Sequence, residues 1–159
     1  MQNYNDPRIP SSVMYVITEG KNPRKIEINY CTAGTNCVGY TLTGSMNISM
    51  ETSNGDKVIQ DEYHLINSNE IKKDDIVVFY NSKGESKHFG RVTNVNTDNN
   101  GNIVDVIYKY TDGKYFNKSE PNENSVNQGD YKHHKKVYYR KNEGTNKPRK
   151  LEDKPTCID

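Results

Sequence analysis

The sequence predicts an α+β domain, and two observations support this fold class. Apolar residues recur at every fourth position after Asn36, at Val38, Leu42, Met46 and Met50, which is the spacing of one face of a helix. The second half of the 159-residue chain instead contains short apolar runs separated by turn signals, the pattern of antiparallel strands. We therefore expect N-terminal helices packed on an antiparallel β-meander.

Two short strands are expected before the first helix. Residues 13–17 form a continuous apolar run. Residues 25–30 alternate, with Ile26, Ile28 and Tyr30 on one face. The polar residues between the two runs predict a turn.

Two helices are expected next. The first is predicted to begin at Cys37 with Asn36 as its N-terminal cap, because an asparagine side chain can accept a hydrogen bond from a free N–H group of the first turn. Gly39 and Gly44 are poor helix formers, so tertiary packing must stabilise this helix. The second helix is predicted over residues 57–66, where apolar residues again follow helical spacing.

The remaining elements are predicted to be strands. We expect them at residues 76–80, 88–95, 103–108 and 136–140. Asn100 and Gly101 form a strong hairpin signal between the second and third of these strands. Residues 117–130 are polar and lack a pattern, which predicts a loop.

Length and charge predict one soluble domain. We expect a single domain over residues 1–142, opening with an irregular arm at residues 1–12, and a basic, flexible tail over residues 143–159. The net charge of +1 gives no reason to expect nucleic acid as a specific partner. No apolar stretch approaches the roughly 20 residues of a membrane span, and residues 1–10 lack the apolar core of a signal peptide.

The cysteines leave at least one free thiol. Cys31, Cys37 and Cys157 cannot all pair with one another, and in an oxidising compartment a bond between Cys31 and Cys157 would leave Cys37 free. The cysteines and the pair His133 and His134 lack a recognised ligand spacing. We therefore expect neither a metal site nor a cofactor.

Cys37 and His88 are the candidate catalytic pair. A thiol in the first turn of a helix lies near unpaired N–H groups and the positive end of the helix dipole, which favour the nucleophilic thiolate. Imidazole is the usual base for such a thiol. His88 begins a predicted strand of the sheet that the helix would contact, whereas His64 closes a predicted helix and His133 and His134 adjoin a basic run.

Three segments resemble the motifs of NlpC-type cysteine peptidases, in the same order along the chain. Residues 35–40, Thr-Asn-Cys-Val-Gly-Tyr, resemble the Asp-Cys-Ser-Gly-Phe signature that opens the catalytic helix. Residues 71–79, Ile-Lys-Lys-Asp-Asp-Ile-Val-Val-Phe, look like the Leu-x-Pro-Gly-Asp-Leu-Val-x-Phe strand, with Lys-Asp in place of Pro-Gly. Residues 88–92, His-Phe-Gly-Arg-Val, look like the His-Val-Gly-Ile strand that carries the catalytic histidine. The resemblance covers residues 36–110 and implies a permuted papain-like fold.

The resemblance also implies a third polar residue, which orients the imidazole from the strand after the histidine. A hairpin folded about Asn100 and Gly101 puts this position near residues 108–112. Asp112 is the candidate there, and Asp105 is the alternative.

The activity that the resemblance implies is hydrolysis of an amide bond. Cys37 would attack the carbonyl, N–H groups at the start of the helix would hold the oxyanion, and His88 would protonate the leaving amine. The usual substrate of the family is a stem-peptide bond of peptidoglycan.

In its small size and its expected lack of a signal peptide, the protein resembles secreted antibacterial amidase effectors. Such effectors leave a bacterial cell by a signal-peptide-independent route and act in the periplasm or in a target cell, and an immunity protein is a further partner that they imply. Two alternatives remain. One is a papain-like toxin that deamidates a protein side chain or transfers a group to it. The other is a catalytically silent binding module of the same fold.

Overall fold

The computed structural model describes residues 12–30, 35–46, 48–111 and 121–144, which form an α+β domain. The elements are β1 (Ser12–Ile17), β2 (Lys25–Tyr30), α1 (Cys37–Thr43), β3 (Ile48–Ser49), α2 (Thr52–Glu62), β4 (Tyr63–Ile66), β5 (Ile76–Tyr80), β6 (Ser86–Thr97), β7 (Ile103–Tyr110), β8 (Asn122–Ser125) and β9 (Lys135–Lys141). Apart from residues 12, 143 and 144, the predicted arm and basic tail lie outside the described residues, as do Cys31 and Cys157. No helix in the described ranges has the length and apolar character needed to cross a membrane.

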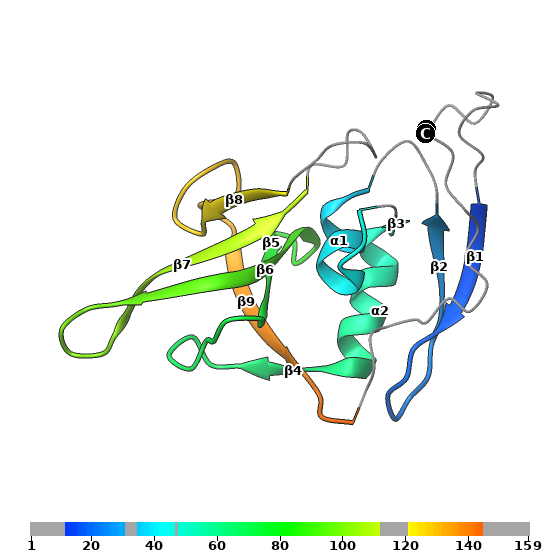
Figure 1. Ribbon diagram of the computed structural model, residues 1–159, viewed down its shortest axis with the longest axis horizontal. Helices are drawn as coiled ribbons and strands as arrows, with labels where there is room; N and C mark the ends of the chain where they lie inside the picture. Colours follow the sequence, from blue (N-terminus) through cyan, green and yellow to red (C-terminus); the bar gives the residue numbers. More distant parts are fainter. Residues whose placement is uncertain (1–11, 31–34, 47, 112–120, 145–159) are drawn as a thin grey trace.

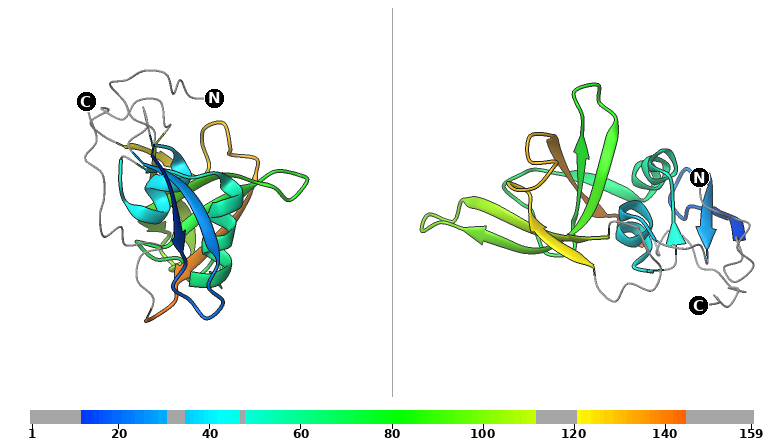
Figure 2. Two further views of the ribbon diagram at one scale, coloured as in Figure 1. Left: turned by 90° about the vertical axis from the view of Figure 1, so that its right-hand side faces the viewer. Right: turned by 90° about the horizontal axis from the view of Figure 1, so that it is seen from above.

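Two antiparallel sheets lie on either side of the helices. The smaller sheet has the order β1-β2-β3, and the larger has the order β4-β9-β5-β6-β7-β8. Figures 1 and 2 show α1 and α2 between them. The main core joins all three layers: Ile26 and Ile28 of β2, Leu42 of α1, Val58 of α2 and Val78 of β5 belong to one buried cluster.

Strand β5 is buried on both faces, which explains its continuous apolar run. Ile76 and Val78 face the helices in the main core. Val77 and Phe79 belong to a second buried cluster on the opposite face of the sheet. Because successive side chains of a strand alternate between faces, a strand covered on both sides must be apolar throughout.

The expected meander is confirmed for β5, β6 and β7, but the last predicted strand lies elsewhere. Strand β9 pairs with β5 on the side away from β6, with Val78 opposite Val137, and also pairs with β4. The predicted loop over residues 117–130 is wrong for residues 122–125, which form β8 and pair with β7, with Lys109 opposite Glu123, and is confirmed for residues 126–130. This edge strand is polar and is held by backbone hydrogen bonds to β7. It therefore lacks the apolar pattern by which a strand is predicted from sequence.

The first helix begins where the sequence predicts but ends earlier. Gly44 takes a left-handed conformation with φ of 76° and caps α1 after Thr43. Met50 lies after β3 and is buried in the same core as Leu42, so the fourfold spacing of apolar residues continues beyond the end of α1. Tertiary burial, rather than one helix face, produced that pattern.

The predicted second helix is also shifted. Helix α2 ends at Glu62, and the residues up to Ile66 form β4 instead. The Asp61 carboxylate accepts hydrogen bonds from the backbone N–H groups of Gly20 at 2.8 Å and Asn22 at 2.7 Å. The end of α2 is thereby fastened to the turn between β1 and β2, a long-range contact that the local sequence does not reveal.

Candidate active site

Asn36 fixes the start of α1 and the position of Cys37. Its side-chain oxygen accepts hydrogen bonds from the N–H groups of Gly39 at 2.8 Å and Met50 at 3.1 Å, and its amide group donates to the Met50 carbonyl at 2.7 Å. The predicted cap is therefore confirmed, and it also fastens the helix to the segment after β3. Cys37, as the first residue of α1, is held in a defined position.

Strand β6 brings His88 close to Cys37. Within the described residues, the pairing of β6 with β7 begins at Arg91, three residues after His88. Helix α1 packs against β6 there, and the backbone N–H of Phe89 donates a hydrogen bond to the Cys37 thiol.

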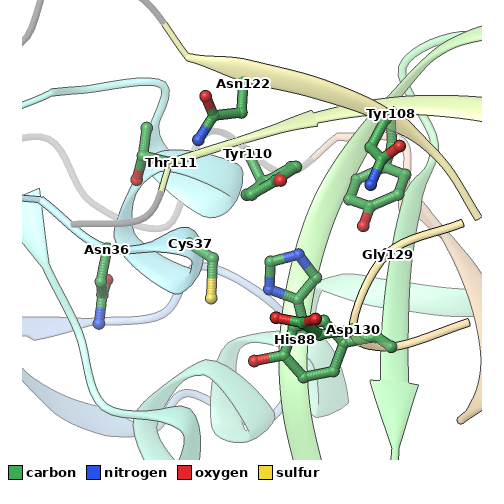
Figure 3. A pocket seen from close by; sticks show the side chains of 11 residues that line it. Asn36, Cys37, His88, Tyr108, Tyr110, Thr111, Asn122, Gly129 and Asp130 are labelled. Carbon is green, nitrogen blue, oxygen red and sulfur yellow. The ribbon is translucent and has the colours of Figure 1, made fainter. Parts of the chain in front are cut away.

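Cys37 and His88 share one cavity of about 410 Å³. Figure 3 shows the sulfur directed toward the imidazole, with one ring nitrogen on the side of the sulfur. No hydrogen bond joins the sulfur to the ring. The described residues that line this cavity are Asn36, Cys37, His88, Tyr108, Tyr110, Thr111, Asn122, Asn124, Gly129, Asp130 and Tyr131.

Close backbone approaches require the glycines of two motif-like segments. A Cβ atom on Gly39 would lie 2.1 Å from the Ile48 carbonyl oxygen, so α1 could not approach β3. A Cβ atom on Gly90 would lie 2.2 Å from the Tyr108 ring, which covers Gly90 next to the histidine. Both glycines therefore help to set the positions of α1 and β6 on either side of the cavity.

The segment that leads into β5 has a structural role. Asp74 adopts a left-handed φ of 76°, a conformation that favours glycine, at the position where the similar motif has glycine. Asp75 is buried, and Arg140 of β9 donates two hydrogen bonds to its carboxylate, at 2.7 and 2.8 Å. Asp75 also accepts from the N–H of Lys72 at 2.8 Å, so it closes the turn and joins β5 to β9.

Aromatic rings enclose the imidazole. Tyr131 stacks on His88 with ring centroids 4.3 Å apart and an angle of 9° between the planes. Tyr110 and Tyr108 approach the imidazole with their rings nearly perpendicular to it, with centroids at 4.7 and 5.7 Å, and Phe79 lies at 5.3 Å. No local pattern singled out Tyr131, because it follows a polar, unpatterned stretch and reaches His88 only through the tertiary fold.

Burial leaves both members of the pair uncharged. Desolvation lowers the pKa of His88 to about 4, and His134 acts in the same direction. Desolvation also raises the pKa of Cys37 and outweighs the hydrogen bonds from the backbone N–H groups of Phe89, Val38 and Cys37 itself. The expectation of a thiolate favoured by the helix start is therefore wrong for this structure, because the loss of hydration exceeds the effect of the helix terminus.

The orienting residue is not among the described side chains. Nε2 of His88 is buried and has no hydrogen-bond partner within the described ranges. The Asp105 carboxylate instead accepts hydrogen bonds from Ser125 at 2.5 Å and Asn127 at 3.0 Å, and Asp105 lines a different cavity. Asp112 lies outside the described residues, directly after Thr111, which lines the Cys37 cavity. Asp112 thus stays a prediction.

Acidic, cysteine and histidine side chains do not gather into a metal centre in the part of the chain that the structure describes. No group of three or more of them there could hold a metal ion. The chemistry available at the cavity, as described, is that of a thiol next to an imidazole.

Comparison with known proteins gives no match: no family model, no curated protein and no solved structure matches this chain. A function must therefore be inferred from the residues and geometry of the cavity.

Proposed function

We propose that this protein is a cysteine hydrolase that cleaves amide bonds, with Cys37 as the nucleophile and His88 as the general base and acid. One observation carries the proposal: a thiol from the start of α1 and an imidazole from β6 lie next to each other in one cavity (Figure 3). A nucleophile beside a base is the arrangement that covalent catalysis needs.

The uncharged pair can perform this reaction by general-base catalysis. As the Cys37 sulfur bonds to the substrate carbonyl carbon, its proton passes to the His88 imidazole, which is neutral above about pH 4. The imidazolium then protonates the departing amine and leaves a thioester. Water attacks the thioester, gives a proton to His88, and the same proton returns to the sulfur as the acid product leaves.

Backbone groups are available to stabilise the oxyanion. The N–H groups of Cys37 and Val38 lie against the sulfur, next to the position where the carbonyl oxygen would become charged. The Asn36 side chain is already engaged with Gly39 and Met50, so it serves the cap rather than the substrate.

A permuted papain-like arrangement is the finer fold that we propose. Two of the three motif-like segments line the cavity: residues 35–40 open α1 and contribute Asn36 and Cys37, and residues 88–92 lie in β6 and contribute His88. The third, residues 71–79, forms the turn before β5 and most of β5, which pairs with β6. The left-handed Asp74 and the close packing at Gly39 and Gly90 give physical reasons for the residue types at matching motif positions.

The proposed substrate is a peptide amide, with a stem-peptide bond of peptidoglycan as the specific candidate. Amide and hydroxyl side chains of Asn122, Asn124 and Thr111 line the cavity and can hydrogen-bond to a peptide backbone. An antibacterial effector that acts in the periplasm or in a target cell is the biological setting that agrees with this substrate.

Digestion of purified peptidoglycan tests the proposal. We expect the full chain to release new amino groups, detected by mass spectrometry of the soluble fragments, and Cys37→Ala and His88→Ala to abolish the release. The double variant should be no worse than either single variant, because the two residues act as one unit. His64→Ala is the matched control, since His64 is exposed on β4 and bonds to Asn142.

Other outcomes would contradict the proposal. Full activity of His88→Ala would exclude His88 as the base. Release of ammonia from a protein, with peptidoglycan intact, would support a deamidating toxin. Intact peptidoglycan and peptides, together with a Cys37 reactivity that His88→Ala does not change, would support a silent binding module.

The third catalytic residue has a separate test. We expect Asp112→Asn to lower kcat with little change in KM, because it would remove the group that orients the imidazole. Asp105→Asn is the matched control, since Asp105 bonds to Ser125 and Asn127 instead. A loss with Asp105→Asn but not with Asp112→Asn would reverse the assignment.

A further inference from the structure

The described lining of the Cys37 cavity includes an acidic side chain and no lysine or arginine. Asp130 is the one acidic or basic side chain among the described residues that line it, apart from the pair itself. Cys37 and His88 are both uncharged near neutral pH, because burial raises the pKa of the thiol and lowers that of the imidazole to about 4. Among the described lining residues, the charged side chain is therefore the carboxylate of Asp130.

The turn after β8 holds Asp130 at the cavity. Gly129 adopts a left-handed φ of 85°, and its carbonyl accepts a hydrogen bond from the N–H of Lys132 at 3.3 Å. The next residue along the chain, Tyr131, stacks on the imidazole of His88 at 4.3 Å. Because both neighbours are fixed, Asp130 is positioned in the lining of the cavity that also contains Cys37 and His88 (Figure 3).

The Asp130 carboxylate makes no stabilising hydrogen bond or ion pair with another described residue, unlike three other aspartates of the chain. Asp61 closes the turn between β1 and β2, Asp75 pairs with Arg140, and Asp105 bonds to Ser125. No hydrogen bond or ion pair to another described residue engages Asp130 in this way. The Asp130 carboxylate is therefore available, among the described residues, to bind a molecule in the cavity.

We propose that Asp130 forms a subsite for a cationic group of the substrate, a primary ammonium close to the amide bond that is cleaved. This inference rests on the proposed hydrolase function. A carboxylate bonds to an ammonium group through charge-assisted hydrogen bonds, which are about twice as strong as neutral ones. At about 4 Å in water, the attraction alone favours a cation over a neutral analogue by about fivefold.

A charge series of thiol reagents tests this subsite without a known substrate. Methanethiosulfonates that carry an aminoethyl, a hydroxyethyl or a sulfonatoethyl group share one leaving group and differ in charge. Their reaction rates at Cys37 would be measured on the full chain by peptide mapping, which separates Cys37 from Cys31 and Cys157. Ratios between reagents cancel any change in the reactivity of the thiol itself.

We expect Asp130→Asn to lower the ratio of the aminoethyl to the hydroxyethyl rate by about three- to tenfold. Asp130→Lys should make the sulfonatoethyl reagent the preferred one. Asp98→Asn is the matched control, because this exposed aspartate binds its own hairpin turn through Asn100 and Asn102. Equal ratios in the original chain and in both Asp130 variants would overturn the inference.

The inference and the proposed function can fail separately. Charge selection at Cys37 without hydrolysis of any peptide would preserve the cationic subsite and contradict the hydrolase. Hydrolysis that is equally fast for a peptide with a free amino group and for its acetylated form, in the original chain and in Asp130→Asn, would contradict the subsite alone.

Discussion

The imidazole of His88 and the phenol ring of Tyr131 stack face to face, with centroids 4.3 Å apart and 9° between their planes. Tyr131 thereby covers one face of the ring, and Tyr110 approaches its edge. Burial lowers the pKa of His88 to about 4, so the stacked ring belongs to the group of side chains that keep the imidazole neutral.

Tyr131→Ala should therefore raise the pKa of His88 from about 4 toward its ordinary value of 6.5, because water would reach the imidazole. Tyr131→Phe keeps the ring and should leave the pKa unchanged. An NMR titration of the histidine ring protons measures both variants, with exposed His64 as an internal reference. An unchanged titration in Tyr131→Ala would show that Tyr131 does not shield the imidazole.

The lowered pKa of His88 also makes stability depend on pH. Between about pH 6.5 and pH 4 the unfolded chain binds a proton at this histidine while the folded chain does not, so acid favours unfolding. The free energy of unfolding should fall by about 3 kcal/mol from pH 7 to pH 4, and the loss should be complete below the folded pKa.

Urea unfolding of the original chain and of His88→Gln measures this contribution. The variant lacks the titrating group, so its stability should fall by about 3 kcal/mol less over the same range, whatever the carboxylates contribute to both proteins. Parallel pH profiles would show that His88 titrates normally in the folded chain.

The reactivity of Cys37 should follow its raised pKa. We expect its rate of alkylation by iodoacetamide to be lower at neutral pH than that of a free thiol and to keep rising as the pH increases, because desolvation raises the pKa and disfavours the thiolate. Mass spectrometry of the Cys37 peptide measures the rate, and free glutathione provides the reference. A high, constant rate down to acidic pH would instead reveal a thiolate and imidazolium pair.

Gly90→Ala should disturb the cavity through Tyr108. The new Cβ atom would lie 2.2 Å from the ring, so the ring must move, at a cost of about 1 to 3 kcal/mol in the free energy of unfolding. Because Tyr108 also contacts His88, hydrolysis should fall as well. The double variant Gly90→Ala, Tyr108→Leu should recover part of the stability in urea unfolding, and purely additive losses would exclude this clash as the cause.

Local patterns in the sequence predicted the elements that local chemistry controls. The alternation over residues 25–30 identified β2, and the apolar run at residues 76–80 identified β5. The side-chain oxygen of Asn36 bonds to the N–H of Gly39 three residues later, so the cap that marks the start of α1 could be predicted from neighbouring residues. The choice of Cys37 and His88 followed from these elements, and the structure places both in one cavity.

Only the tertiary structure decided the features that depend on distant residues. Strand β9 lies between β4 and β5, and Tyr131 lies on His88, because chain segments far apart in sequence pack together there. The charge state of the pair follows the same rule. The helix start, a local feature, favours a thiolate at Cys37, but burial by the surrounding fold raises its pKa, since desolvation is a property of the whole packed cavity.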